Sequence, residues 1–306
     1  RMELAFTGGR IRYPKPFIRD GRYRPFIPGT AVKGAIRTAM LYSIIKNDDK
    51  KLDDFCSYVD KNLNDVQRRR PRERDKNRIK ESFAKKINED IFMGYSLNQK
   101  QKQNGPHTDI LRCLKISDSI NSPKGLKLED VMLMSLRGAN SRSAYNKNGT
   151  ILNVECIPPG VNVEFTLSLD MDILKYFQEN NKNIPFANLN DIINMIKEFS
   201  KAQWDEQEDF FAWVKDSRDV TLEKVWEFYD NGYCPSIRVG WGSGLLGTTI
   251  DLLLGRDSTK RLRNLLFTDR RDDEAPKSRR LTVSRVGNQL EAQLPLGWME
   301  LKVNHN

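Results

Sequence analysis

The chain contains few of the residues that build metal centres and disulfide frameworks: two histidines and four cysteines among 306 residues. The cysteines stand singly, with no C-x-x-C pair and no histidine at ligand spacing, at Cys56, Cys113, Cys156 and Cys234. This spacing argues against a zinc site and against a disulfide scaffold. We expect buried free thiols in a reducing compartment instead.

Long apolar runs are also missing. No stretch of about eighteen apolar residues is present, and the first residues lack the apolar core of a signal peptide. The sequence therefore predicts a soluble, cytoplasmic protein that is long enough to bury a hydrophobic core without the help of disulfide bonds.

Catalytic chemistry finds little support in the sequence. General acid or base cleavage would have to use His107, in a Gln-rich loop, or His305, in the terminal tail. Asp118 follows an expected strand, but no second carboxylate is spaced to share a metal with it, so capping of a turn or helix is the favoured interpretation. We therefore predict no enzyme activity, no metal and no cofactor.

Positive charge is the main feature that is present. Lys and Arg number 51 against 41 Asp and Glu, and the resulting net charge of +10 favours a polyanionic partner. The charge is uneven, because residues 68–86 and 259–285 are strongly basic whereas residues 204–230 hold nine acidic and three basic residues. This polarity suits a protein that binds nucleic acid on one side and a protein on another, although exposed helix faces and insertions produce similar runs.

The first candidate site is the segment IPGTAVKGAIRTAML, residues 27–41. It predicts a turn followed by a helix over about 31–46, with Thr30 as N-cap and a positive dipole end that suits a phosphate. Lys33 and Arg37 lie four residues apart and would share a face near this end. An ordinary capped surface helix would show the same local pattern. The residues predicted to contact a phosphate are Pro28, Gly29, Thr30, Lys33, Gly34 and Arg37.

The second candidate site is a glycine-rich loop near the C-terminus. Glycines at alternate positions allow backbone amides to approach a phosphate closely. The G-x-G-x-G spacing differs from that of a dinucleotide-binding motif, and no P-loop Lys-Ser/Thr follows. A tight turn, with Trp241 in the core rather than stacked on a base, is the alternative. The predicted contacts are Arg238, Gly240, Trp241, Gly242, Ser243 and Gly244.

The pattern of strands and helices, without regular βαβ repeats, indicates an α+β fold. We predict two domains, 1–150, with a basic helical insertion at about 48–108, and 151–306, with the glycine-rich loop. Helices are expected over 48–63, 74–92, 189–201, 205–215, 222–229 and 251–267. Strands are expected over 111–116, 131–136, 236–239, 281–286 and 298–303, and residues 151–157 and 161–169 are expected to form a hairpin around Pro158-Pro159-Gly160.

Four strings in the chain resemble one protein family. IPGTAVKGAIRTAML is similar to the IPG-S-x-[IL]-KGA-[IL]-R-TA pattern of the RAMP proteins of type III CRISPR effector complexes. LRCLKISDS at 111–119, IRVGWGSGLLGTTI at 237–250 and PLGWM at 295–299 also match. Together, in this order, the strings resemble the fifth-subunit family of the Csm (type III-A) complex.

This resemblance implies two ferredoxin-like (RRM-like) halves and a non-catalytic subunit that binds CRISPR RNA. It implies a position at the head of the complex, capping the 3′ region of the guide and supporting its maturation in antiviral defence. The implied partners are the CRISPR RNA and the neighbouring Csm backbone and small subunits. Recruitment of a host trimming nuclease stays open.

Two departures from the family pattern affect the prediction. The chain opens at Arg1-Met2-Glu3-Leu4 without the family's N-terminal glycine-bearing loop, and Thr248 stands where many relatives carry a Lys. Two alternative functions also stay open: an endoribonuclease that processes the guide through His107, and a backbone-type RAMP subunit that cleaves target RNA with an Asp and a divalent metal.

Overall fold

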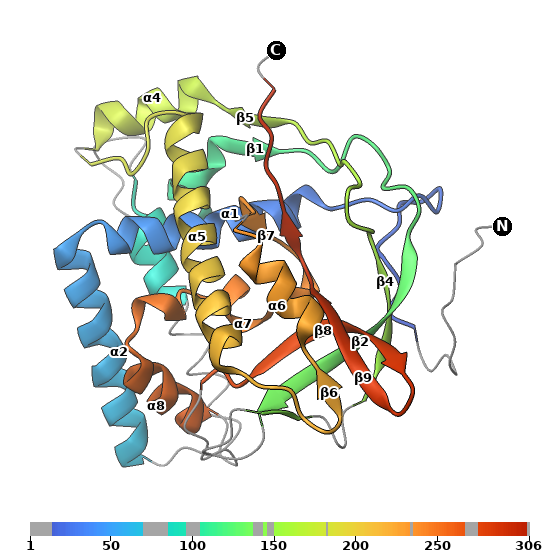
Figure 1. Cartoon of the computed structure of the whole chain (residues 1–306). Coiled ribbons are helices and arrows are strands. Elements are labelled where there is room, and N and C mark those ends of the chain that lie inside the picture. Colours follow the sequence, from blue (N-terminus) through green and yellow to red (C-terminus); the bar gives the residue numbers. More distant parts are fainter. Residues whose placement is uncertain are drawn as a thin grey trace.

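The structure, a computed structural model, describes residues 14–69, 85–95, 105–136, 143–145, 150–181, 183–232, 235–266 and 275–304. Helices and strands are mixed along the chain, which confirms the predicted α+β class (Figure 1). The first 13 residues, the part of the predicted helix 74–92 that precedes residue 85, and His305 lie outside the described residues.

The helices are α1 (Gly29–Lys46), α2 (Asp49–Arg69), a helix over 85–92, α4 (Met171–Asn180), α5 (Leu189–Trp213), α6 (Glu223–Asp230), α7 (Gly244–Thr248) and α8 (Arg256–Leu266). Short 3₁₀ turns are η1 (Pro106–Thr108), η2 (Ile110–Arg112), η3 (Trp241–Ser243) and η4 (Asp251–Leu253). The strands are β1 (Leu114–Ile116), β2 (Lys127–Leu136), β3 (Ala144–Tyr145), β4 (Leu152–Cys156), β5 (Leu167–Leu169), β6 (Val220–Thr221), β7 (Ile237–Arg238), β8 (Ser278–Val286), β9 (Gln289–Pro295) and β10 (Trp298–Met299).

A six-stranded sheet organises one end of the molecule. Its order is β3-β2-β8-β9-β6, and β4 pairs with the first half of β2. Alternate residues of a strand point to opposite faces, so Met132 and Met134 of β2 share a face with Leu281 of β8. This face packs against Trp204 and Phe211 of α5, and all five side chains are buried. The opposite face carries the alternate residues.

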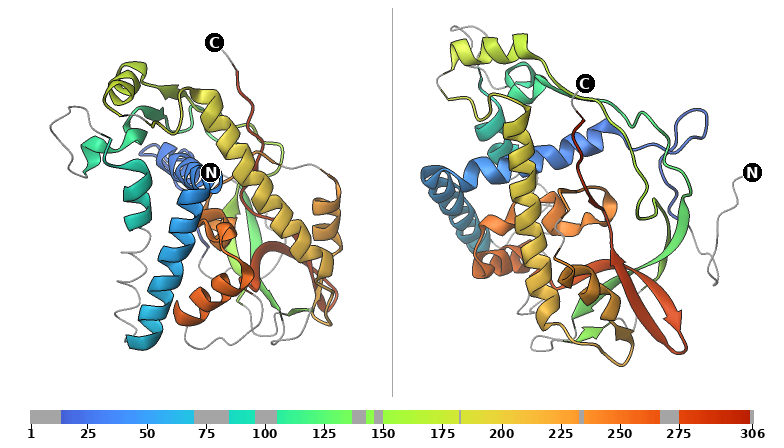
Figure 2. Two further views of the ribbon diagram at one scale, coloured as in Figure 1. Left: turned by 90° about the vertical axis from the view of Figure 1, so that its left-hand side faces the viewer. Right: turned by 45° about the horizontal axis from the view of Figure 1, so that its top comes forward.

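A second core lies where α1 crosses α5. Met40 of α1 and Ile196 of α5 are buried there. The long helix α5 serves both cores: its first half packs in this one and its second half under the sheet, as the two views of Figure 2 show. Each core draws residues from both sides of residue 150, and the predicted domain division at that position stays a prediction.

Several predicted elements differ from the structure. The strand expected over 111–116 is the turn η2 followed by the short β1, because Asp109 accepts a hydrogen bond from the Leu111 N–H and starts a 3₁₀ turn. The helices expected over 189–201 and 205–215 are the single helix α5. The helix expected over 251–267 is η4 followed by α8.

The hairpin expected around Pro158-Pro159-Gly160 is wrong. β4 pairs with β2, and β5 pairs with β1, so the two segments separate into different sheets after the turn. The hairpin that does form joins β8 to β9, and the prediction missed β9. Among the described cysteines, Cys113 is a buried free thiol as expected, whereas Cys56 and Cys156 are half-buried. No helix among the described residues combines the length and apolar character that a membrane span needs.

Candidate nucleic-acid interface

The start of α1 differs from the predicted cap. The helix begins at Gly29, and the Pro28 carbonyl accepts hydrogen bonds from the N–H groups of Ala31 at 2.9 Å and Val32 at 3.3 Å. The prediction of Thr30 as N-cap is therefore wrong, because the cap position is Pro28 and has no side-chain hydrogen bond. A distant carboxylate supplies the missing acceptor: the Gly29 N–H donates to Oδ1 of Asp118 at 2.8 Å. This contact confirms the predicted capping role of Asp118.

Gly29 is required at this point by close packing rather than by its backbone angles. A Cβ at Gly29 would lie 2.4 Å from the carbonyl oxygen of Ser117 and 2.6 Å from that of Ile116. The α1 start is thereby pressed against the end of β1. The IPG motif and the ISDS motif, which are far apart in the sequence, form one structural unit.

The two cations predicted to face a phosphate are used inside the protein. The Lys33 ammonium donates to the carbonyl oxygens of Leu111 at 2.8 Å and Leu114 at 2.6 Å, and burial lowers its pKa. Arg37 donates to Asp109 at 2.9 Å and to Asn88 at 3.0 Å. Its guanidinium also lies 4.6 Å from the centre of the Phe92 ring. These contacts tie η2 and the helix over 85–92 to α1. Contact of Lys33 and Arg37 with a phosphate stays untested.

The exposed side of the α1 start is formed by small residues. Thr30 and Gly34 are exposed, and a Cβ at Gly34 would meet no atom within 4 Å. α1 also contacts α7, the helix that follows the glycine-rich loop. The structure thus brings the two sequence motifs together, although they are separated by about two hundred residues in the chain.

The glycine-rich loop is a tight turn that depends on its glycines. Gly240 and Gly244 have φ of 97° and 71°, in the left-handed region that other residues rarely adopt. Gly242 lies against the C-terminal PLGWM segment, and a Cβ there would come within 2.2 Å of the Leu296 Cβ. The Ser243 hydroxyl donates to the Gly240 carbonyl oxygen at 2.8 Å. These contacts fix the turn and leave the side chain of residue 241 projecting from it.

Arg238 is held inside the protein. Its side chain is only 6% exposed, its Nε donates to the Leu296 carbonyl oxygen at 3.0 Å, and its guanidinium lies 4.8 Å from the Trp298 ring centre. Burial lowers its pKa. Arg238 therefore joins the glycine turn to the PLGWM segment, and it does not present its charge to solvent.

Trp241 contacts two cations. Its side chain is 37% exposed, with the Lys15 ammonium 4.0 Å and the Arg280 guanidinium 4.5 Å from its ring centre. Lys15 bridges to Val154 of β4, and Arg280 is paired with Leu133 of β2. Pairing partners point to the same face, so both cations stand on the sheet face opposite the α5 core. The indole therefore lies over the open face of the sheet.

Two exposed leucines extend this surface. Leu133 is 44% and Leu152 is 38% exposed. The β2–β4 register places both on the same face as Arg280. We call this set, Lys15, Leu133, Leu152, Trp241 and Arg280, the open-face platform. It combines an aromatic ring, aliphatic surface and two cations, a composition suited to stacking with bases and pairing with phosphates.

One edge of the platform is anchored by a carboxylate. Glu155 accepts from the Phe17 N–H at 2.7 Å and from the two terminal nitrogens of Arg19 at 2.7 and 2.8 Å. The hydrogen bonds of Arg19 lower the pKa of Glu155. Backbone bonds from the Lys15 N–H to Asn153 and from the Glu155 N–H to Lys15 complete the attachment. Segment 15–19 is thereby held against β4, with Lys15 beside Trp241.

A family profile and two solved structures resemble this chain. A sequence profile of the RAMP superfamily matches residues 5–246. A chain in the cryo-EM structure of a Csm–crRNA–target RNA ternary complex from a type III-A CRISPR–Cas system is 25% identical, with a TM-score of 0.58, covering 92% of this chain and 74% of that one. The crystal structure of T. onnurineus Csm5 is 22% identical, with a TM-score of 0.52, covering 80% of this chain and 70% of that one, and shows a shared fold.

Among curated proteins, no sequence matches the chain. The two structural neighbours agree with the resemblance to Csm proteins that the four sequence strings carry. Since the profile covers most of its length, the chain belongs to the RAMP superfamily.

Proposed function

We propose that the chain is a non-catalytic subunit of a type III-A Csm interference complex that binds the CRISPR RNA. In this role it caps the end of the particle that holds the 3′ region of the guide, contacts the neighbouring backbone and small subunits, and supports maturation of the guide. As part of that particle it would act in the cytoplasm. Membership of the RAMP superfamily and the likeness to a chain of a crRNA-containing Csm complex support this proposal.

The observation that carries the proposal is the open-face platform beside the glycine turn. Lys15 and Arg280 offer positive charge beside the partly exposed Trp241 ring. Bases of any sequence present a face for stacking, and phosphates are paired with cations irrespective of sequence. Such a surface suits a guide whose sequence varies.

The non-catalytic part of the proposal is supported by the environment of the candidate catalytic groups. Asp118 accepts the Gly29 N–H as a helix cap. His107 is exposed, and its carbonyl oxygen accepts a hydrogen bond from Arg112. We propose structural roles for Lys33, Arg37 and Arg238, whereas the exposed residues Thr30 and Gly34 and the turn at 240–244 would approach the RNA backbone.

Substitution of Trp241 by Ala tests the proposal. Loss of base stacking should weaken binding of single-stranded RNA by roughly 5- to 150-fold, the equivalent of about 1–3 kcal/mol. Binding is measured by fluorescence anisotropy with RNAs of unrelated sequence, and the same mixtures are analysed for cleavage.

Trp226→Ala provides the control, since Trp226 is a half-buried tryptophan that packs against the α5 core, away from the platform. Equal affinity of wild type and Trp241→Ala would contradict the platform. Cleavage by the wild type that is lost in His107→Ala would favour the endoribonuclease alternative, and cleavage that a chelator abolishes would favour the metal-dependent one.

A further inference from the structure

The second half of α5, the loop after it and α6 form an acidic surface. Residues 204–230 contain nine acidic and three basic residues, in a chain whose net charge is +10. The carboxylates lie outward, since Glu208, Asp209, Asp216, Glu223 and Asp230 are all exposed. A phosphate backbone would be repelled here, because like charges brought together cost free energy.

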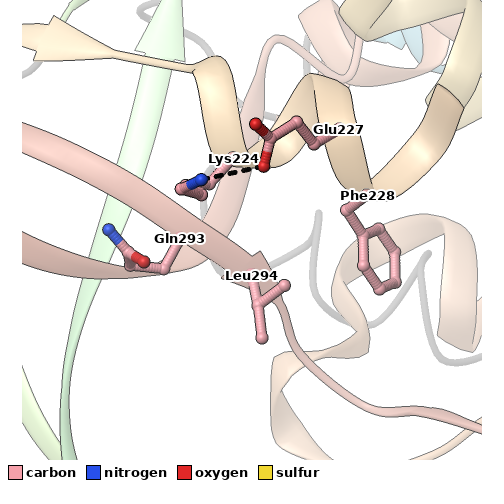
Figure 3. A pocket seen from close by; sticks show the side chains of 5 residues that line it. All are labelled: Lys224, Glu227, Phe228, Gln293 and Leu294. Carbon is pink, nitrogen blue, oxygen red and sulfur yellow. Dashed lines mark hydrogen bonds and ion pairs between the residues drawn. The ribbon is translucent and has the colours of Figure 1, made fainter. Parts of the chain in front are cut away.

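A groove of about 340 Å³ lies within this acidic region, between α6 and β9. It is lined by Lys224, Glu227, Phe228, Gln293 and Leu294. Figure 3 shows the side chains of Phe228 and Leu294 pointing toward the same side of the groove. The Phe228 ring lies 5.3 Å from that of Trp204, so the apolar wall rests on the buried core.

The surface around this groove is acidic, although a lysine lines the groove itself. The Lys224 ammonium donates to Glu227 at 2.9 Å, the dashed contact of Figure 3. This hydrogen bond raises the pKa of Lys224, and the charges of Glu223 and Glu291 add to the effect. The Lys224 ammonium is therefore paired with Glu227, whereas Glu223 and Asp230 are further carboxylates at exposed positions of α6.

We infer that the α6–β9 groove docks a basic segment of a protein partner. An apolar side chain of the partner occupies the groove against Phe228 and Leu294, and its lysines or arginines face the exposed α6 carboxylates Glu223, Glu227 and Asp230. Charge complementarity selects this occupant over RNA, and a mixed apolar and charged contact is typical of protein interfaces. The identity of the partner as another subunit of the same particle rests on the proposed function.

Zero-length carbodiimide cross-linking of the reconstituted particle tests the docking directly, because this reagent joins only carboxylates and amines in contact. We expect Glu223, Glu227 or Asp230 to be joined to a lysine of another subunit, as identified by mass spectrometry of the peptides. If these carboxylates join only Lys224 within the chain, or if ultraviolet cross-linking places RNA at the groove, the inference is wrong.

Two variants test the groove in assembly. Glu227→Lys combined with Asp230→Lys reverses the rim, and we expect at least a tenfold loss of the chain from the co-purified particle. Leu294→Trp enlarges the apolar side chain that lines the groove without changing charge, and it should also reduce incorporation. Asp53→Lys combined with Asp54→Lys changes charge equally at exposed positions of α2 and serves as the control.

The outcome for RNA separates this inference from the proposed function. Both groove variants, checked for folding by circular dichroism, should bind single-stranded RNA at least as tightly as the wild type. Normal incorporation of the folded variants would overturn the docking proposal alone. Absence of RNA binding by the wild type would overturn the proposed function and leave the cross-linking result decisive for the groove.

Discussion

The open-face platform and the α6–β9 groove share the β8–β9 hairpin but differ in charge. Arg280 of β8 belongs to the platform, whereas Gln293 and Leu294 of β9 line the groove. The platform places two cations beside a partly exposed aromatic ring, whereas in the groove the one ammonium is paired with Glu227 and the surrounding surface is acidic. The difference teaches that a single β-hairpin can contribute to two surfaces of unlike charge, and we propose that the two surfaces bind different classes of partner.

The largest expected effect on RNA binding comes from reversing the charge of the platform, so that it becomes acidic like the surface around the groove. In Lys15→Glu combined with Arg280→Glu, two attractive contacts become repulsive, and RNA affinity should fall on the order of a hundredfold at 0.1 M salt. The dependence of affinity on salt should become shallower by roughly 0.7 in logarithmic slope for each lost phosphate contact. Anisotropy titrations at several salt concentrations measure both quantities.

A control separates the platform from net charge. Lys50→Glu combined with Lys61→Glu produces the same charge change at exposed positions of α2. An equal loss of affinity in the two double variants would show that overall charge, and not the platform, governs RNA binding.

A smaller effect is expected from a substitution that tests whether the start of α1 belongs to the RNA-binding surface. Gly34→Leu places a side chain over the exposed side of α1, where a Cβ meets no atom within 4 Å. The helix should gain roughly 0.5–1 kcal/mol of stability because glycine is replaced in its interior. RNA affinity should nevertheless fall several-fold, because the side chain blocks close approach of the sugar-phosphate backbone. Denaturant unfolding and anisotropy are measured on the same preparation.

The matched control is Ala212→Leu, which likewise places a leucine side chain at an exposed helical position, on the acidic side. It should leave RNA affinity unchanged. Unaltered affinity in Gly34→Leu as well would exclude the α1 start from the RNA surface and restrict the interface to the platform.

The sequence predicted local features better than pairings. α6 and the start of β7 follow from periodicity and turn residues, and the capping role of Asp118 follows from its place after a strand. The partner of each strand could not be predicted: Pro158-Pro159-Gly160 indicated a hairpin, but tertiary packing sent β4 and β5 to different sheets. Pairing between distant segments is set by the whole core and leaves little local signal.

The candidate site was predicted only in part for the same reason, because strand pairing cannot be read from local sequence. Trp241 was predicted from its glycine neighbours, whereas Lys15 and Arg280 were missed because only strand register reveals that they lie beside the ring. Arg238, next to the glycines, suggested a phosphate contact, but the PLGWM segment buries it. The alternation of polar and apolar residues in β2 and β8 was the available signal, and it required knowing which strands are neighbours.

The smallest expected effect concerns the contacts that keep the residues of each surface in place. The apolar wall of the groove rests on core packing, whereas the platform edge depends on Glu155, whose pKa is lowered from 4.5 mainly by the hydrogen bonds of Arg19. A carboxyl group with a lowered pKa in the folded state stabilises the protein above its unfolded pKa and loses this contribution as the pH falls through the folded value.

Glu155→Gln should therefore reduce the free energy of unfolding by about 1 kcal/mol at neutral pH, and the difference from wild type should shrink below about pH 4.5. Urea unfolding between pH 3.5 and 7 measures this difference, with Glu164→Gln, at an exposed position, as the control for loss of a carboxylate. RNA affinity at pH 7 should change less than threefold, because the backbone bonds of Lys15 to Asn153 and Glu155 remain. A difference that stays constant over the whole pH range would show that the Arg19–Glu155 contact does not hold the platform edge through its charge.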